Sequence, residues 1–338
     1  MKIKIVLAVA AILIPAVAAA AVTSSHNYEK IKSLSDFKGN VTSIAFSPSG
    51  KVVAIGTSEK TVVLWDAASW QVIKTLNEND GDVNAVVFSH DGKYLASGDK
   101  RNKVMVFDTQ TWKRVMKIKA YNTVNALSFN KDDSILAIAC DDNDAMLWNM
   151  QKDSLFKKLK GHQRDVKSIA FSPDGTKVAT GSSDNTVILW DSASGNMMKT
   201  LTGHTNDIAA VSFSPDGKYL ISGSRDNTII IWDGKSGNKI NVLNGHSSKM
   251  AILSFLPGSN VVSSGDSNMT VRGTGPFGIP IYSEDTCKIV FWDAVSAKQI
   301  KAMSSDCDLS SMAYSTDGKY LVTGHNGSTN YITVWGRK

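Results

Sequence analysis

The chain has 338 residues and a formal net charge of +6, which falls to +4 without Lys2 and Lys4 of the N-terminal segment. This charge is mild, Lys and Arg are spread along the chain, and no basic run interleaves with aromatic residues, so we do not expect a dedicated nucleic-acid-binding surface. Length alone would suggest two domains.

The first 21 residues differ from the rest of the chain. Lys2 and Lys4 precede an uncharged apolar run over residues 5–17, and four alanines follow at 18–21. This pattern is typical of a bacterial secretory signal peptide. An uncleaved anchor is the alternative, because a bilayer-spanning helix needs about 20 apolar residues, but Pro15 and the alanines favour cleavage. We therefore expect a signal peptide at 1–21, a mature chain at 22–338 without a membrane span, and a periplasmic or extracellular location.

A strand is predicted at 29–34. The same pattern returns at 71–76 and at 196–201, each time as the last strand of a repeating unit, whereas residues 29–34 have no unit in front of them. The last unit ends at Trp335 and has no fourth strand of its own. A spare strand at one end therefore matches a missing strand at the other.

The unit at 207–246 shows the repeat most clearly. Four runs of about five β-branched and aromatic residues, bounded by Gly, Asp, Asn or Pro, predict four short strands joined by tight turns. Its Trp232-Asp233 pair recurs at Trp65, Phe107, Trp148, Trp190, Trp292 and Trp335, in steps of 42, 41, 42, 42, 60 and 43 residues. Both faces of the third strand are apolar, so one unit cannot stand alone and its neighbours must cover it.

These Trp-Asp pairs, the Gly-His pairs at His162, His204 and His246, and the Ser-Pro-Asp-Gly turns at Ser172 and Ser214 resemble the WD40 repeat family. The resemblance covers nearly the whole chain after the leader. It implies a single all-β domain, a seven-bladed WD40 β-propeller whose ring is closed by the N-terminal strand pairing into the last blade. Closure would remove the open sheet edges that invite aggregation.

In this family, a buried tetrad of His, Ser or Thr, Asp and Trp is linked by hydrogen bonds. The resemblance implies complete tetrads in unit four, His162, Thr180, Asp184 and Trp190, and in unit five, His204, Ser222, Asp226 and Trp232. The same positions in units one to three hold Phe37, Ile55, Glu59 and Trp65; Asn79, Ser97, Arg101 and Phe107; and Ala120, Ile138, Asp142 and Trp148. We expect these three blades to depend on strand pairing and apolar packing alone, and units four and five to be the most rigid.

Unit six carries an insertion at about 266–285, between its second and third strands. The family places this connection on the face with the Gly-His loops, which most often binds partners, and long loops on rigid scaffolds usually carry function. Phe277, Ile279, Ile281 and Tyr282 form either a hydrophobic contact tip or a loop folded over the blade or channel. The string G-x-G-x-x-G at 273–278 is not a dinucleotide site, because Pro280 and its β-branched neighbours forbid the following helix. No cofactor is predicted.

The histidines and cysteines have structural interpretations. His162, His204 and His246 belong to tetrad positions, His90 replaces the proline of a turn and is expected to be exposed, and His325 stands alone in unit seven. No zinc-binding or nucleophile motif is present. We expect Cys140 to be a buried free thiol. Cys287 and Cys307 fall on one face, where an exported protein either joins them or leaves them unpaired.

The resemblance implies a monomeric, non-catalytic scaffold that binds protein or peptide partners on the face of the unit-six insertion. The candidate contact residues are Lys100, Arg164, Ser183, Arg225, Phe277 and Tyr282. The alternative is a propeller hydrolase or lyase with a metal in the central channel, for which Asp82, Asp165 and Asp207, and nearly equivalently Asn40 and Asp308, occupy suitable places. These residues also fit ordinary turn and cap chemistry.

Overall fold

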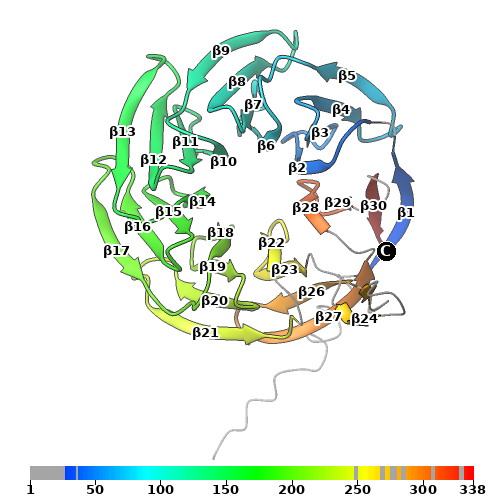
Figure 1. Ribbon diagram of the computed structural model, residues 1–338, viewed down its shortest axis with the longest axis vertical. Coiled ribbons are helices and arrows are strands. Elements are labelled where there is room, and N and C mark those ends of the chain that lie inside the picture. Colours follow the sequence, from blue (N-terminus) through cyan, green and yellow to red (C-terminus); the bar gives the residue numbers. More distant parts are fainter. Residues whose placement is uncertain are drawn as a thin grey trace, which may run out of the picture.

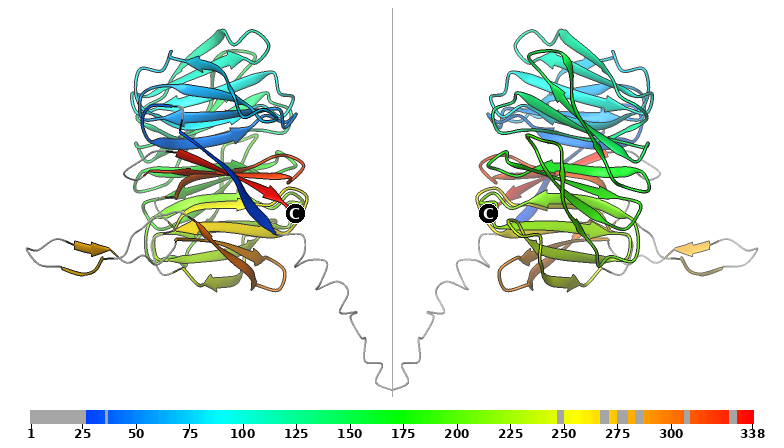
Figure 2. Two further views of the ribbon diagram at one scale, coloured as in Figure 1. Left: turned by 90° about the vertical axis from the view of Figure 1, so that its right-hand side faces the viewer. Right: turned by 90° about the vertical axis from the view of Figure 1, so that its left-hand side faces the viewer.

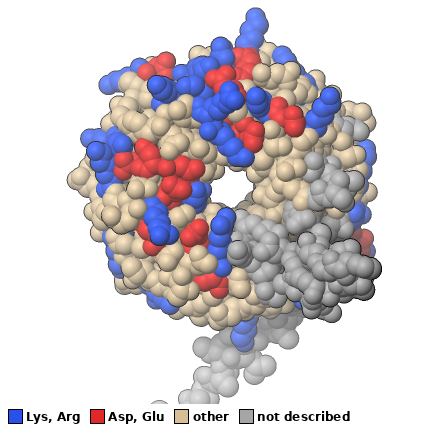
Figure 3. All heavy atoms as spheres, in the orientation of Figure 1, with Lys and Arg blue, Asp and Glu red and all other residues tan. Residues whose placement is uncertain are grey.

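The computed structural model describes residues 27–35, 37–246, 250–266, 271–274, 280–282, 287–305, 309–326 and 331–338. These residues form seven four-stranded antiparallel sheets, arranged as the blades of a ring, and one additional two-stranded sheet (Figure 1). A central channel passes through the ring, as the space-filling view in Figure 3 shows. The predicted all-β, seven-bladed β-propeller is confirmed. The predicted signal peptide at 1–21 lies outside the described residues.

Blades one to six follow the chain from the innermost strand outwards. Blade one contains β2 (Val41–Phe46), β3 (Val52–Thr57), β4 (Val62–Asp66) and β5 (Val72–Leu76), and blade two contains β6 (Val83–Phe88), β7 (Tyr94–Asp99), β8 (Lys103–Asp108) and β9 (Arg114–Lys119). Blade three contains β10 (Val124–Phe129), β11 (Ile135–Cys140), β12 (Asp144–Asn149) and β13 (Ser154–Lys160), and blade four contains β14 (Val166–Phe171), β15 (Lys177–Ser182), β16 (Val187–Asp191) and β17 (Met197–Leu201). Blade five contains β18 (Ile208–Phe213), β19 (Tyr219–Ser224), β20 (Thr228–Asp233) and β21 (Lys239–Asn244), and blade six contains β22 (Met250–Phe255), β23 (Val261–Asp266), β26 (Cys287–Asp293) and β27 (Lys298–Ser305).

The last blade joins the two ends of the chain. Its strands are β28 (Leu309–Tyr314), β29 (Tyr320–His325), β30 (Tyr331–Arg337) and, outermost, β1 (Tyr28–Leu34). β1 runs antiparallel to β30, with Glu29 opposite Gly336 and Leu34 opposite Ile332. The predicted closure of the ring is therefore confirmed, and β1 covers the edge of β30 that would otherwise be unpaired.

The core is divided among the seven seams between neighbouring blades. Each seam holds one cluster of buried side chains contributed by both blades; the seam between blades four and five, for example, brings Leu189 and Leu201 against Ile208 and Trp232. Ile230, in the middle of a third strand that is apolar on both faces, is 1% exposed. Because each blade covers its neighbour, the repeat becomes stable only as a ring.

The side-chain hydrogen bonds of the predicted tetrad in blade four meet at one hydroxyl group, that of Thr180. The Trp190 indole N–H donates to Thr180 Oγ1 at 2.8 Å, Thr180 Oγ1 lies 2.7 Å from His162 Nε2, and His162 Nδ1 lies 2.8 Å from Asp184 Oδ2. An ionised Asp184 accepts a hydrogen bond from His162 Nδ1–H, so Nε2 accepts one from the Thr180 hydroxyl, and each of these linked atoms has a partner. Burial lowers the pKa of His162 despite the nearby Asp184, which keeps the imidazole neutral.

Blade five repeats this arrangement. Ser222 Oγ lies 2.8 Å from both the Trp232 indole nitrogen and His204 Nε2, and His204 Nδ1 lies 2.9 Å from Asp226 Oδ2. Blades six and seven keep a shorter version, in which Ser264 joins His246 to Trp292 and Thr323 joins His325 to Trp335. His325 therefore does not stand alone: it reaches the hydroxyl from the end of β29 rather than from a Gly-His loop.

Blade two has a polar substitute for the tetrad. Ser97 donates to the Asn79 side-chain oxygen at 3.0 Å. The fully buried Asp99 carboxylate accepts hydrogen bonds from four backbone N–H groups, those of Asp80, Gly81, Arg101 and Lys103. The prediction that this blade depends on strand pairing and apolar packing alone is wrong, because Asp99 caps two front-face turns at once.

Blades one and three show what the missing hydroxyl changes. In blade one, Ile55 replaces the hydroxyl residue, and the buried Trp65 indole N–H makes no hydrogen bond with the described residues. In blade three, Ile138 stands at this position and the Trp148 indole N–H donates instead to Asp153, at 3.2 Å.

Trp70 lies in the turn between β4 and β5 of blade one and reaches across the seam to blade seven. Its φ of 55° is left-handed, at the turn position that Gly195 and Gly237 occupy in blades four and five. The Trp70 ring packs edge-on against Tyr320 of blade seven, at a centroid distance of 5.6 Å. The contact ties blade one to blade seven at the seam where the ring closes.

Candidate binding face

The hairpin inserted in blade six identifies one face of the disc. Its strands β24 (Val271–Thr274) and β25 (Pro280–Tyr282) pair with Gly273 opposite Ile281, so part of the predicted loop is a small sheet. Figure 2 shows these strands standing out from the face that points to the viewer in Figure 1. We call this the front face. It carries the connections from second to third strands and from fourth strands to the next blade.

The predicted contact residues with described side chains lie around the front mouth of the channel. Lys100, Ser183 and Arg225 hold equivalent positions: the backbone N–H of each donates to the carbonyl of Asp82, Asp165 or Asp207, respectively, at 2.9–3.0 Å. The carbonyl of Arg164, in a neighbouring connection, accepts a hydrogen bond from Ser182. Tyr282 ends β25, within the insertion, and Phe277 lies outside the described residues.

Ion pairs of alternating charge line the part of this mouth that blades two to five form (Figure 3), and we call them the charged ring. Lys100 Nζ lies 2.8 Å from Asp82, and the Arg225 guanidinium lies 3.7 Å from Asp207. Between them, Lys167 Nζ joins two blades, at 2.6 Å from Asp141 and 3.0 Å from Asp165. Burial opposes a charged Lys167, but its hydrogen bonds to both carboxylates outweigh this effect and raise its pKa. Sequence reasoning missed Lys167 and Asp141 because their contact joins neighbouring repeats.

This pairing bears on the metal-site alternative. Each of Asp82, Asp165 and Asp207, the candidate metal ligands, already has a cationic partner. Among the residues that the structure describes, no three His, Cys, Asp or Glu side chains form a group suited to a metal ion. Asn40 lies in the equivalent connection of blade one, where its carbonyl accepts from the Ser58 N–H, and Asp308 lies outside the described ranges.

Side chains at the innermost strands fix the mouth. Each innermost strand has a β-bulge near its first residues. At three of these bulges the side chain donates to a backbone carbonyl of the next blade: Thr42 to Val83, Asn84 to Val124 and Asn125 to Val166. Asn326 closes the series by donating to Val41 at 2.8 Å. Two of these links, from Asn84 and Asn125, join blades that carry the charged ring and hold them in register.

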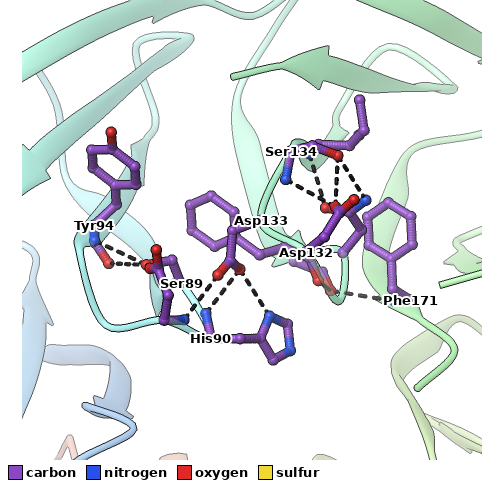
Figure 4. Close-up of polar contacts among 12 residues, drawn as sticks. Ser89, His90, Tyr94, Asp132, Asp133, Ser134 and Phe171 are labelled. Carbon is purple, nitrogen blue, oxygen red and sulfur yellow. Dashed lines mark hydrogen bonds and ion pairs between the residues drawn. The ribbon is translucent and has the colours of Figure 1, made fainter. Parts of the chain in front are cut away.

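The back mouth of the channel contains a hollow of about 270 Å³. Phe129, Phe171, Pro173 and Pro215 are among its lining residues. His90 also lines this hollow, where Asp133 joins two turns: its carboxylate lies 2.9 Å from His90 Nδ1 and accepts from the His90 and Asp91 backbone N–H groups (Figure 4). The His90 side chain is 59% exposed, as predicted.

The cysteines divide between described and undescribed parts of the chain. Cys140 is a buried free thiol, as predicted, and burial raises its pKa to about 12, so it is a poor nucleophile. Cys287 begins β26 and Cys307 lies outside the described residues, so their possible disulfide lies outside what the structure describes. In the described ranges, no helix is both long and apolar enough to cross a bilayer.

Two family models match the chain. The model of the WDR19 first β-propeller matches residues 89–256, which run from blade two into blade six. The model of the Nucleolar protein 10-like N-terminal domain, also a β-propeller, matches residues 11–152. No curated protein matches the chain. Both matched models describe β-propellers, in agreement with the seven blades of the structure.

Proposed function

Because the chain is a WD40-type β-propeller, we propose that it is a non-catalytic scaffold whose front face binds protein or peptide partners. Propellers of this type generally mediate protein–protein interactions. The observation that supports the front face is its ring of ion pairs, held in place by side-chain links between blades.

The charged ring is better suited to recognising a partner than to stabilising the fold. Exposed ion pairs of this kind contribute only about 0–1 kcal/mol each to folding. In an interface, however, fixed alternating charges select a partner of complementary pattern and speed its approach. The links from Asn84 and Asn125 to the next blade reduce the ordering that binding would require.

The same ring favours binding over catalysis. A metal-dependent hydrolase or lyase would need Asp82, Asp165 and Asp207 to turn toward a shared ion. Their carboxylates are instead neutralised by Lys100, Lys167 and Arg225. Elemental analysis of the purified protein tests this alternative: a stoichiometric metal would support the enzyme over the scaffold.

We further propose that residues 1–21 direct export, that they are cleaved, and that a monomeric propeller of residues 22–338 acts in the periplasm or outside a bacterial cell. The apolar run after Lys2 and Lys4 and the four alanines that follow support this proposal. The intact mass and N-terminal sequence of protein from its native host test it. A chain that starts at Met1 would contradict cleavage.

Affinity capture from the native cell envelope tests the front face. Lys100→Ala with Arg225→Ala removes two ring cations, and the matched control, Lys93→Ala with Lys218→Ala, removes cations paired with Asp91 and Asp216 at back-face turns. We expect the front-face variant to lose captured partners and the control to keep them, with equal thermal unfolding. Equal capture by both variants would contradict the proposal.

A second capture experiment tests the insertion. Deleting residues 273–282 removes the end of β24 and all of β25, which lie outside the four-stranded sheet of blade six. We expect capture to be lost while thermal unfolding stays nearly unchanged. Full capture by this variant would assign no role in binding to the hairpin.

A further inference from the structure

The outer edge of the disc has a composition unlike the rest of the surface. The seven outermost strands, β1, β5, β9, β13, β17, β21 and β27, contain thirteen Lys or Arg residues and a single acid, Glu29. Nine of the eleven most exposed large hydrophobic residues in the described chain lie on the same strands. Thirteen of the chain's 37 Lys and Arg residues therefore lie on strands that carry almost no acid.

A β-bulge explains why the apolar side chains are exposed. Each outermost strand skips one residue in its pairing with the third strand, next to the Trp or Phe of that strand. In β9, β13 and β17 the skipped residues are Val115, Phe156 and Met198, which are exposed by 55%, 39% and 51%. A bulge bends the strand and redirects the side chain of its extra residue.

The charge is most concentrated on three neighbouring blades. β9, β13 and β17 together contain seven Lys or Arg residues and no acid, and Figure 1 shows them side by side along one arc of the disc. We call these three strands the basic sector. The other four outermost strands are longer in total but contain six cations and Glu29.

Ion pairs reduce this charge only in part. Arg114 pairs with Glu78, Lys117 with Asp80 and Lys158 with Asp144. Lys119, Lys157 and Lys160 form no ion pair with the described residues, and Lys157 Nζ lies 5.5 Å from the ring centroid of Phe156. The centre of the sector, β13, thus presents Leu155 and Phe156 directly beside lysines.

We propose that the basic sector binds the surface of an anionic lipid bilayer, with the disc standing on its edge. An arc of strands touches a flat surface at its middle, which is β13. There Phe156 and Leu155 would enter the headgroup region, while the lysine ammonium groups stay at the phosphates and their methylene stems cover apolar surface. A soluble polyanion such as nucleic acid would use the lysines but not the exposed aliphatic side chains.

Lysines on outermost strands also have a general role, because charge on an edge strand blocks pairing with other chains. That role applies to all seven blades alike. Lipid binding by the basic sector, in contrast, predicts that lysines of β9 and β13 contribute to vesicle binding and that lysines of the other outermost strands do not.

Vesicle sedimentation distinguishes these roles. The protein is the chain from residue 22 onward, which keeps every described strand of the closed ring. The probes are vesicles containing phosphatidylglycerol and vesicles of phosphatidylcholine alone, at low and high salt. We expect salt-sensitive binding to the anionic vesicles only. No binding to anionic vesicles, or equal binding to both, would overturn the proposal.

Charge variants locate the contact. The sector variant carries Lys119→Gln, Lys157→Gln and Lys160→Gln, and the matched control carries Lys74→Gln, Lys239→Gln and Lys298→Gln on β5, β21 and β27. Each lysine near an anionic surface changes partitioning about fivefold, so we expect the sector variant to lose binding on the order of a hundredfold. We expect the control to bind almost as the parent does. Equal losses would overturn the sector.

A substitution at the bulge tests the apolar part. Phe156→Ser should weaken binding to anionic vesicles, whereas Ile240→Ser, at the equivalent bulge of β21, should not. Circular dichroism and thermal unfolding of all variants confirm that the ring is intact. If single-stranded DNA or polyglutamate binds to the sector while anionic vesicles do not, the partner is a soluble polyanion and the lipid proposal is wrong.

Discussion

Removing one hydroxyl in blade four should destabilise the propeller far more than the change in size suggests. Thr180→Val keeps the shape of the side chain but removes Oγ1, the atom that joins the Trp190 indole N–H to His162 Nε2. Thr180 is fully buried, and Trp190 and His162 are 1% and 6% exposed, so water cannot replace the hydroxyl. Each buried polar group left without a partner costs about 1–3 kcal/mol, and two are created, so we expect a loss of about 2–6 kcal/mol.

Urea denaturation followed by tryptophan fluorescence measures this loss. The control is Thr186→Val, which removes a hydroxyl at the partly exposed end of the same network, where Asp184 keeps its other hydrogen bonds. We expect the control to cost well below half as much. A loss of under about 0.5 kcal/mol for Thr180→Val would refute the assignment of this hydroxyl as the centre of the network.

Ile55→Thr should be about 1 kcal/mol less destabilising than Ile138→Thr in urea denaturation, because only the first gives an unpartnered buried indole N–H an acceptor; equal losses would contradict this. Trp70→Gly should cost about 2–4 kcal/mol, since the lost packing exceeds the roughly 1 kcal/mol of left-handed strain that glycine relieves; a more stable variant by calorimetry would show that strain dominates. Burial lowers the pKa of His162 and His204 from 6.5, so the unfolded chain takes up protons first, and stability should be complete above pH 6.5 and fall on acidification below it; replacing both by Gln should flatten this slope, and an unchanged slope would contradict it.

Most of the fold could be predicted because it depends on contacts within one repeat and on the spacing between repeats. The alternation around Trp232 and the turns that bound it predicted the strands of blade five, and the unmatched segment at 29–34 predicted the closure with β30. The resemblance to the WD40 family, carried over position by position, predicted which side chains would meet in blades four and five, where His162 and His204 reach their hydroxyl partners.

The missed features depend on contacts between repeats or on changed roles within one. Lys167 contacts Asp141, and His90 contacts Asp133, across the seams between neighbouring blades. A comparison of equivalent positions does not reveal such pairs, because the two partners hold different positions in their repeats. Asp99 was missed for another reason. It stands at the end of the second strand, where blades four and five have a serine, and its carboxylate accepts hydrogen bonds from backbone N–H groups. A comparison limited to the four tetrad positions does not include this residue.

The outer edge could have been recognised from sequence by aligning the fourth strands. The segments at Arg114–Lys119 and Ser154–Lys160 are basic runs that alternate with apolar residues. A net charge taken over the whole chain hides these basic runs, because it also includes the acidic residues, which are concentrated in the turns. The structure places these runs on neighbouring blades, which is what makes them one surface.

Site-specific photo-crosslinking in living cells tests the central claim most directly. One photoreactive amino acid is placed at position 183 on the front face, where the backbone N–H donates to the carbonyl of Asp165, a residue of the charged ring. The comparison protein carries it at position 218, at a back-face turn. We predict that position 183 forms a covalent adduct with a distinct protein partner and that position 218 does not. Adducts from position 218 alone would contradict a scaffold that binds its partners through the front face.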